Sequence, residues 1–133
     1  MTRKLQEQLY EKYPEIFADR TKPMTETAMC WGIECDDGWY DLIDELCKKI
    51  MVAYVEDDIE IPVASQVKEK YGSLCFYVTG GNDAVYDLIR NAEKMSEKTC
   101  EICGNKGLQF INNRGWMKTL CAAHAVELEY VID

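Results

Sequence analysis

Two kinds of targeting segment are missing from this sequence. Residues 1–9 lack the apolar run and the small-residue cleavage site of a secretory signal. No stretch approaches the roughly eighteen consecutive apolar residues that a membrane-spanning helix needs. The sequence also contains no internal repeat and no low-complexity tract. We therefore expect a cytoplasmic protein that has no membrane partner.

Residues for common catalytic chemistry are also scarce. The chain has a single histidine, His124, so a histidine-dependent nuclease or a Cys–His nucleophile would lack its base if that side chain bound a metal. Gly80-Gly81 is an isolated pair, without the lysine and further glycines of a phosphate-binding loop. Paired carboxylates occur between residues 36 and 60, where a solvated acidic face is the simpler interpretation. We expect the protein not to be an enzyme.

Negative charge is plentiful and unevenly placed. With 133 residues, 47% of them apolar and 29% charged, the chain has the composition of one folded domain. Its net charge is -9, and residues 26–60 contain eleven acidic but only two basic side chains. Such a region attracts a protein partner with a basic surface, although an acidic face that serves only solubility is the alternative. The candidate partner-binding residues are Asp36, Asp37, Asp41, Asp44, Glu45, Glu56, Asp57, Asp58 and Glu60.

Apolar residues recur at helical spacing in three segments. The first predicted helix spans residues 2–13 and ends before Pro14. The second spans residues 38–54 and follows short polar side chains that can cap it. The third begins at the capping pair Asn82-Asp83 and includes residues 85–95. These helices would form most of a body over residues 1–98.

Alternating apolar side chains predict a β-hairpin between the second and third helices. Residues 63–68 and 74–78 form the two strands, and residues 70–73 supply the turn. The predicted fold class is therefore α+β, with a hairpin core followed by a C-terminal module over residues 99–133, packed on the body as one compact domain. The core face of the hairpin would contain Val63, Val67, Leu74, Phe76 and Val78.

Four of the potential metal ligands are grouped near the end of the chain. The seven cysteines are an odd number in a chain without an export signal, so reduced thiols and metal ligation are expected instead of disulfides. Cys100 and Cys103 are separated by two residues and precede Gly104, which favours a turn that directs both sulfurs at one ion. Cys121 and His124 lie three apart at the start of an expected final helix. These four residues predict one zinc ion.

The order of elements in this segment resembles a treble-clef zinc finger. Residues 108–111 and 116–119 flank a strong turn signal over residues 112–115, so a hairpin separates the two ligand pairs. The resemblance covers about residues 99–130 and implies that the four residues occupy the ligand positions of that family. Four protein ligands fill a tetrahedral zinc shell, whereas catalytic zinc keeps a position for water, so a structural site is expected. Unrelated buried cysteines are the alternative.

The other four cysteines offer a second candidate metal site. Cys30, Cys35, Cys47 and Cys75 have separations that match no usual ligand pair, except loosely Cys30 and Cys35. Cys47 and Cys75 lie among apolar residues and are interpreted as small core residues. We therefore expect one ion, with a second site left open.

Three stretches are similar to small proteins encoded by phages and prophages. They run from Gly32 to Ile43, from Gln66 to Val78 and from Thr99 to Gly104, and those proteins also end with Gly-Trp and Thr-Leu-Cys-x-x-His. The resemblance implies a phage-encoded chain that works in the host cytoplasm. It implies no catalytic residue.

These observations favour a non-enzymatic, zinc-stabilised binding protein. Its acidic surface would contact a host or phage macromolecule, and it would suit an inhibitor of a host nucleic-acid-binding or defence protein. The alternative is a nucleic-acid-binding zinc finger that uses the C-terminal hairpin and helix, where Lys106, Arg114, Lys118 and Trp116 could contact nucleic acid. Direct nucleic-acid binding is the weaker prediction, because three scattered cations in an acidic chain neutralise few phosphates.

Overall fold

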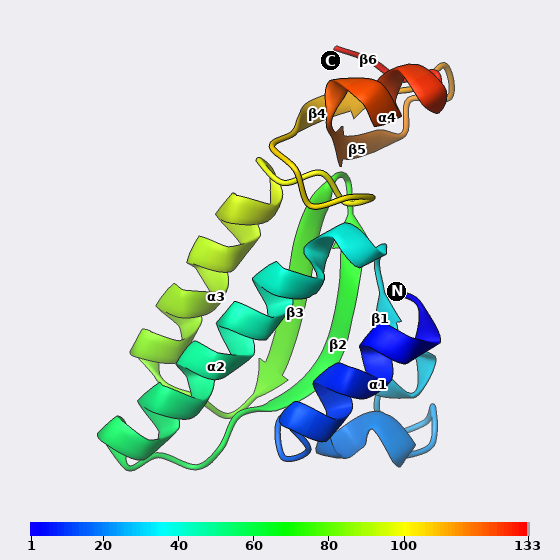
Figure 1. The fold of residues 1–133 in the computed structure, drawn as a ribbon. Coiled ribbons are helices and arrows are strands. Elements are labelled where there is room, and N and C mark those ends of the chain that lie inside the picture. The colour runs from blue at the N-terminus through cyan, green and yellow to red at the C-terminus, as the bar shows by residue number, and fades with distance from the viewer. Residues whose placement is uncertain (133) are drawn as a thin grey trace.

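The computed structural model describes residues 1–132, and within them it has four α-helices and two three-stranded sheets (Figure 1). The predicted α+β class is confirmed. Asp133, which belongs to the predicted C-terminal module, lies outside the described residues. The helices are α1 (Arg3–Lys12), α2 (Tyr40–Asp57), α3 (Asp83–Ser96) and α4 (Ala122–Glu127). The strands are β1 (Ile33–Glu34), β2 (Val63–Lys70), β3 (Ser73–Thr79), β4 (Leu108–Ile111), β5 (Met117–Leu120) and β6 (Val131–Ile132).

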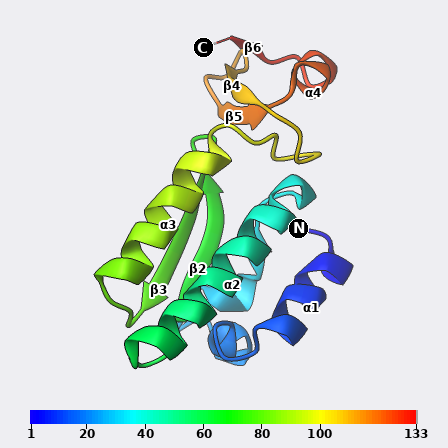
Figure 2. The same ribbon diagram turned by 60° about the vertical axis from the view of Figure 1, so that its left-hand side comes forward.

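The body is a sheet covered by helices. Its strand order is β1-β2-β3, with β1 parallel and β3 antiparallel to β2. Helices α2 and α3 lie side by side against this sheet, and α1 lies beside α2 (Figures 1 and 2). The second sheet, of order β5-β4-β6, lies with α4 at one end of the molecule, next to the β2–β3 turn (Figure 1). The N-terminal end of α2 faces this module, and its other end points away from it.

The three predicted helices of the body are confirmed, with small changes at their ends. α1 covers all but the ends of residues 2–13. A 3-10 turn over Asp37–Trp39 precedes α2, which continues to Asp57 and ends at Asp58 in a left-handed conformation (φ 49°). The side chain of Asn82 caps α3 by accepting a hydrogen bond from the backbone N–H of Val85 (3.0 Å). Within residues 1–132, no helix is long and apolar enough to cross a membrane.

The predicted β2–β3 hairpin is also confirmed, but one residue of its core face was wrong. Val67 is fully buried, as expected, together with Leu74 and Phe76 on the partner strand. Val78 is half-buried and packs against the core, whereas Val63 is half-buried outside it and Ala64 lies in the core instead. The register shifts between Ala64 and Gln66, and such a bulge turns the preceding side chains to the opposite face.

Polar contacts attach the C-terminal module to the body from two sides. The backbone N–H of Gly38 donates to the carbonyl of Glu101 (2.7 Å), and the indole N–H of the fully buried Trp39 donates to the carbonyl of Thr99 (2.9 Å). On the other side, the hydroxyl of Thr119 donates to the carbonyl of Gly72 in the β2–β3 turn (2.6 Å). The start of α2 and the tip of the hairpin therefore both hold the module.

Candidate metal centre

A tight turn positions the first two candidate ligands. The backbone N–H of Gly104 donates to the carbonyl of Cys100 (2.9 Å), and the N–H of Cys100 donates to the carbonyl of Asn105 (2.7 Å). Gly104 has φ +82°, a left-handed conformation that glycine adopts without strain. These bonds fold residues 100–105 back on themselves, so the sulfurs of Cys100 and Cys103 face the same point.

The β4–β5 hairpin brings the second pair to the same place. Residue Cys121 is the N-cap of α4, and His124 lies in the first turn of that helix, as predicted. The N–H of Ala125 donates to the carbonyl of Cys121 (2.9 Å), which closes this first turn. Residues three apart on one helical turn point to the same side, so the thiol and the imidazole converge.

The distances within this cluster fit a single tetrahedral ion. One ligand atom from each of Cys100, Cys103, Cys121 and His124 lies within 4.8 Å of the others. The Sγ atoms of Cys103 and Cys121 are 3.8 Å apart, and Nδ1 of His124 is 3.6 Å from Sγ of Cys100 and 3.2 Å from Sγ of Cys121. A tetrahedron with Zn–S of about 2.3 Å and Zn–N of about 2.0 Å has S···S edges of about 3.8 Å and S···N edges of about 3.5 Å. The cluster can therefore hold one metal ion.

The electrostatics of the cluster favour a cation. The backbone N–H of His124 is the largest influence on Cys121, and it lowers the pKa of that thiol below its usual value. The N–H of Asn105 lowers the pKa of Cys103, but burial and the neighbouring thiols of Cys100 and Cys121 outweigh it, so the pKa is raised. Three sulfurs so close together repel one another when ionised, and a bound cation removes that repulsion.

A buried glutamate lies directly beside the metal ligands. Glu101 is 1% exposed; its Oε2 accepts from the backbone N–H of Asp36 (3.0 Å) and its Oε1 from Nζ of Lys118 (3.2 Å). Burial raises the pKa of Glu101, and Lys118 only partly offsets this. Glu101 therefore joins the turn over residues 100–105, here called the ligand turn, to the body and to β5. No sequence pattern indicates this role, because Glu101 is only one of the two intervening residues of the Cys-x-x-Cys pattern.

The remaining cysteines are not brought together as a second site. Among residues 1–132, the only cluster with metal-ligand spacing is the one described above, and every cysteine is a free thiol. Cys47 is fully buried, and Cys35 is 6% exposed with a pKa raised by burial to about 12. Cys30 and Cys75 are half-buried. The interpretation of Cys47 as a small core residue is confirmed, but that of Cys75 is not, because Cys75 lies outside the buried core.

The acidic candidate residues form two groups at opposite ends of α2. Helix α2 has 18 residues, which at about 1.5 Å per residue separate its ends by about 27 Å. Glu45 and Glu56, the members of the two groups that are nearest along the helix, are about 16 Å apart, which is about twice the screening length of about 8 Å at physiological salt, so the two groups interact weakly. One group, near the module, consists of Asp36, Asp37, Asp41 and Glu45; the other, at the far end, consists of Glu56, Asp57, Asp58 and Glu60.

Asp44 is the exception among the acidic candidates, because its charge is used within the protein. Its Oδ1 accepts hydrogen bonds from the hydroxyl of Tyr13 (2.7 Å) and from Nζ of Lys12 (2.9 Å). Burial raises the pKa of Asp44, but these two bonds outweigh burial and hold the pKa below its usual value. The residue joins α2 to α1 and is a poor candidate for contact with a partner.

We expect Asp44→Asn to lower the free energy of unfolding by about 1–2 kcal/mol at pH 7, because an amide replaces a charged acceptor of two hydrogen bonds. The folded protein holds this carboxylate ionised more strongly than the unfolded chain does. The difference in the free energy of unfolding between wild type and variant is therefore largest above about pH 4, and it decreases as the pH falls further. Urea unfolding of both proteins across this pH range measures it. A difference that stays constant down to pH 2 would contradict the assignment.

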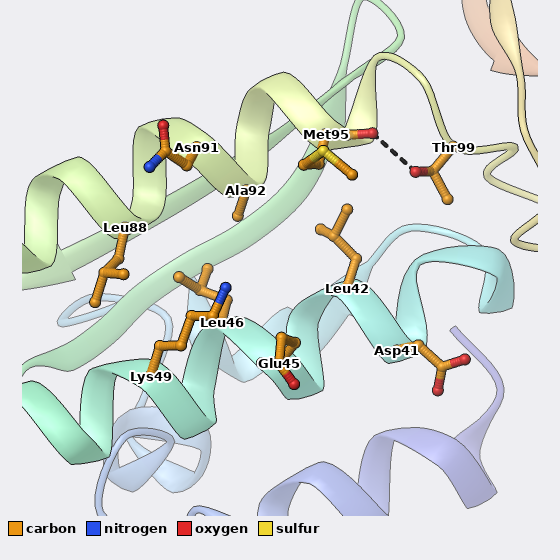
Figure 3. Close-up of a pocket in the computed structure, with 10 residues that line it drawn as sticks. All are labelled: Asp41, Leu42, Glu45, Leu46, Lys49, Leu88, Asn91, Ala92, Met95 and Thr99. Carbon is orange, nitrogen blue, oxygen red and sulfur yellow. Dashed lines mark hydrogen bonds between the residues drawn. The ribbon is translucent and has the colours of Figure 1, made fainter.

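An apolar groove runs between α2 and α3, with a volume of about 370 Å³. Figure 3 shows side chains from both helices that line it. Asp41, Glu45 and Lys49 lie along its α2 edge, so part of the acidic group near the module borders the groove, together with one basic side chain. Its end next to the module is closed by Thr99, whose hydroxyl donates to the carbonyl of Met95 (2.8 Å). The apolar lining consists of Leu42, Leu46, Leu88, Ala92 and Met95.

Comparisons with models of protein families, with curated proteins and with solved structures found no match to this chain.

Proposed function

We propose that the chain is a non-enzymatic binding protein in which one structural zinc ion is held by Cys100, Cys103, Cys121 and His124. Three thiols and one imidazole are a donor set that suits zinc, and their distances fit its tetrahedral shell. Four protein ligands leave no open position for a substrate or water, so the ion serves the fold. The turn, hairpin and helix that supply the ligands support a treble-clef-like module. The module and the body over residues 1–98 would work as one unit.

The binding role is supported by the groove between α2 and α3. Its apolar lining can receive the apolar face of an amphipathic helix, and Asp41 and Glu45 on its edge can pair with basic side chains of that helix. Met95, which is 55% exposed, adds a flexible side chain of the kind that adapts to a bound peptide. We propose that the partner is a protein with a basic amphipathic helix.

The resemblance to phage-encoded proteins supports a setting for this binding. The partner would be a host or phage macromolecule in the host cytoplasm, and the chain would inhibit a host nucleic-acid-binding or defence protein. Proteins of that kind have basic surfaces, which the acidic edge of the groove complements.

A peptide-display selection on the zinc-loaded protein tests this proposal. Selected peptides are expected to have apolar residues at helical spacing together with lysine or arginine, and to bind Met95→Lys at least tenfold more weakly than wild type. The double variant Asp41→Asn/Glu45→Gln is expected to bind about 3- to 10-fold more weakly, because two exposed charge pairs are lost.

The matched control for the double variant is Glu56→Gln/Glu60→Gln. It removes the same amount of charge from the exposed acidic group at the far end of α2, so its peptide affinity is expected to equal that of wild type. Equal losses in the two double variants would mean that net charge alone, and not the groove, attracts the peptides.

Direct nucleic-acid binding remains the second candidate function, and one observation favours it. The guanidinium of Arg114 lies 5.8 Å from the ring centroid of Trp116, on the exposed β4–β5 hairpin. An exposed ring next to a cation is a common contact for nucleic-acid bases.

A further inference from the structure

A second cleft lies between the tips of the two β-hairpins, with a volume of about 360 Å³. The β2–β3 hairpin of the body forms one wall, and the β4–β5 hairpin of the module forms the other. The contact between Thr119 and Gly72 fixes these two hairpins relative to each other. The cleft is therefore a built feature of the fold, even though its walls are more than forty residues apart in the sequence.

Aromatic side chains from both walls line this cleft. Tyr71 is 72% exposed and Trp116 is 61% exposed, while Tyr130 is half-buried beside them. The hydroxyl of Tyr130 accepts a hydrogen bond from Nδ2 of Asn112 (3.4 Å), which holds that ring in place. Large exposed rings lose water when a flat partner stacks on them, so they favour a ligand with aromatic faces.

The backbone of Tyr71 points to a role for its side chain. Tyr71 and Gly72 form the two-residue turn between β2 and β3, and both have positive φ, +53° and +82°. Asn, Asp and Gly are the residues that fit the first position of such a turn, because a bulky side chain is strained there. A tyrosine is thus a poor choice for the turn, and strain of this kind is frequent at binding sites.

Basic side chains surround these rings although the chain as a whole is acidic. Lys68 and Lys70 are two residues apart on β2, so they leave the same face of the strand. Nζ of Lys70 lies 5.8 Å from the ring centroid of Tyr71, as Arg114 does from Trp116. None of Lys68, Lys70 and Arg114 forms an ion pair with any residue that the structure describes.

The acidic side chains nearest the cleft have partners within the protein. Glu69 lines the cleft, but its carboxylate accepts from the backbone N–H of Gly72 (2.8 Å) and so turns back onto the hairpin. Glu101 is buried, and both Glu101 and Asp36, which belongs to the acidic group near the module, pair with Nζ of Lys118 in the cleft (3.2 and 3.9 Å). The acidic group at the far end of α2 is separated from the module by the length of that helix, beyond the screening length.

We propose that this cleft binds single-stranded nucleic acid, with bases stacked on Tyr71 and Trp116 and phosphates paired with Lys68, Lys70 and Arg114. Rings and cations in one groove are the combination that binds unpaired strands. In a duplex the base faces are covered by their neighbours, so the exposed rings would have nothing to stack on. The inference gives the second candidate function a location and a ligand, and it does not rest on the groove between α2 and α3.

Fluorescence anisotropy with a labelled single-stranded 12-nucleotide probe, in DNA and RNA forms, tests the proposal on the zinc-loaded chain. Wild type is expected to bind the probe, with a slope of log K against log salt of about -2, because about three phosphates are neutralised. Trp116→Ala and Tyr71→Asn are each expected to weaken binding about 5- to 100-fold, as the loss of one stacked base requires. Tyr71→Asn is expected to melt no lower than wild type, because Asn suits the turn.

Trp31→Ala is the matched control. Trp31 is 62% exposed, against 61% for Trp116, but it lines a different cavity, so its loss is expected to leave probe affinity unchanged. Absence of probe binding, equal affinities of Trp116→Ala and wild type, or tighter binding of the matching duplex would each overturn the proposal. This test is independent of the peptide test of the groove between α2 and α3. Met95→Lys is expected to bind the probe as wild type does, and Trp116→Ala is expected to bind the selected peptides as wild type does.

Discussion

Replacing Cys100 by serine is expected to abolish stoichiometric zinc binding and to lower the free energy of unfolding by about 3–5 kcal/mol, with a fall in Tm of about 10–20 °C. The physical reason is the small core of the module. Its buried apolar cluster consists of four residues, Cys100, Phe110, Leu120 and Ala125. A core of this size cannot offset the conformational entropy of about thirty ordered residues, so a bound metal has to supply the difference.

Elemental analysis and thermal melting, with and without a strong chelator, measure this effect. Wild type is expected to contain one zinc per chain. Chelation is expected to lower the stability of wild type by as much as Cys100→Ser does, and to leave the stability of the variant unchanged. Cys30→Ser is the control, since Cys30 is also a free thiol but lies outside the cluster. A wild-type protein without metal, or a Cys100→Ser variant with unchanged melting, would contradict the structural zinc site.

The candidate metal ligands could be predicted from the sequence because their signal is local. Two ligand pairs and the hairpin turn between them occur within about 25 residues, and each spacing is set by a single turn of chain. The role of Glu101 could not be recognised in the same way. Its partner Asp36 is 65 residues earlier, and nothing in either local sequence specifies the contact.

The outer parts of the sheets lacked a sequence signal for a different reason. Strands β1 and β6 have two residues each, which is too short for any alternation of apolar and polar side chains to appear. The bulge near Ala64 was hidden because Val63 and Val67 fit a regular strand equally well. The division of the acidic residues, by contrast, could have been predicted, since a helix over residues 38–54 already separates Asp36 from Glu60.

The cleft between the hairpins shows what tertiary structure adds. From the sequence, Trp116 and the cations of its hairpin are candidate nucleic-acid contacts, whereas Tyr71 and Lys70 are predicted only to form a turn. Their proximity depends on how the module is fixed to the body. A substitution at Gly38 therefore tests the attachment of the module to the body without changing a candidate metal ligand or an aromatic residue of the cleft.

Gly38→Ala is expected to lower the free energy of unfolding by about 3 kcal/mol or more while leaving one zinc bound per chain. A β-carbon at residue 38 would overlap the carbonyl oxygen of Cys100 and would lie 2.5 Å from the carbonyl carbon of Glu101. Both are backbone atoms, and the bonds within the ligand turn prevent them from moving aside. The ligand turn would have to leave α2, which breaks the hydrogen bond between Gly38 and Glu101 and the one between Trp39 and Thr99.

Gly115→Ala separates this steric effect from the general cost of replacing glycine. Gly115 has φ +80°, so alanine is strained there, but no other atom lies within 4 Å of the added carbon. We expect Gly115→Ala to lower the free energy of unfolding by about 1 kcal/mol. Chemical denaturation and metal analysis of both variants give the comparison, and equal losses of stability would mean that Gly38 does not join the module to the body. Since Gly38→Ala removes no metal ligand, loss of stability with retained zinc would show that the body requires the docked module, and not the ion alone.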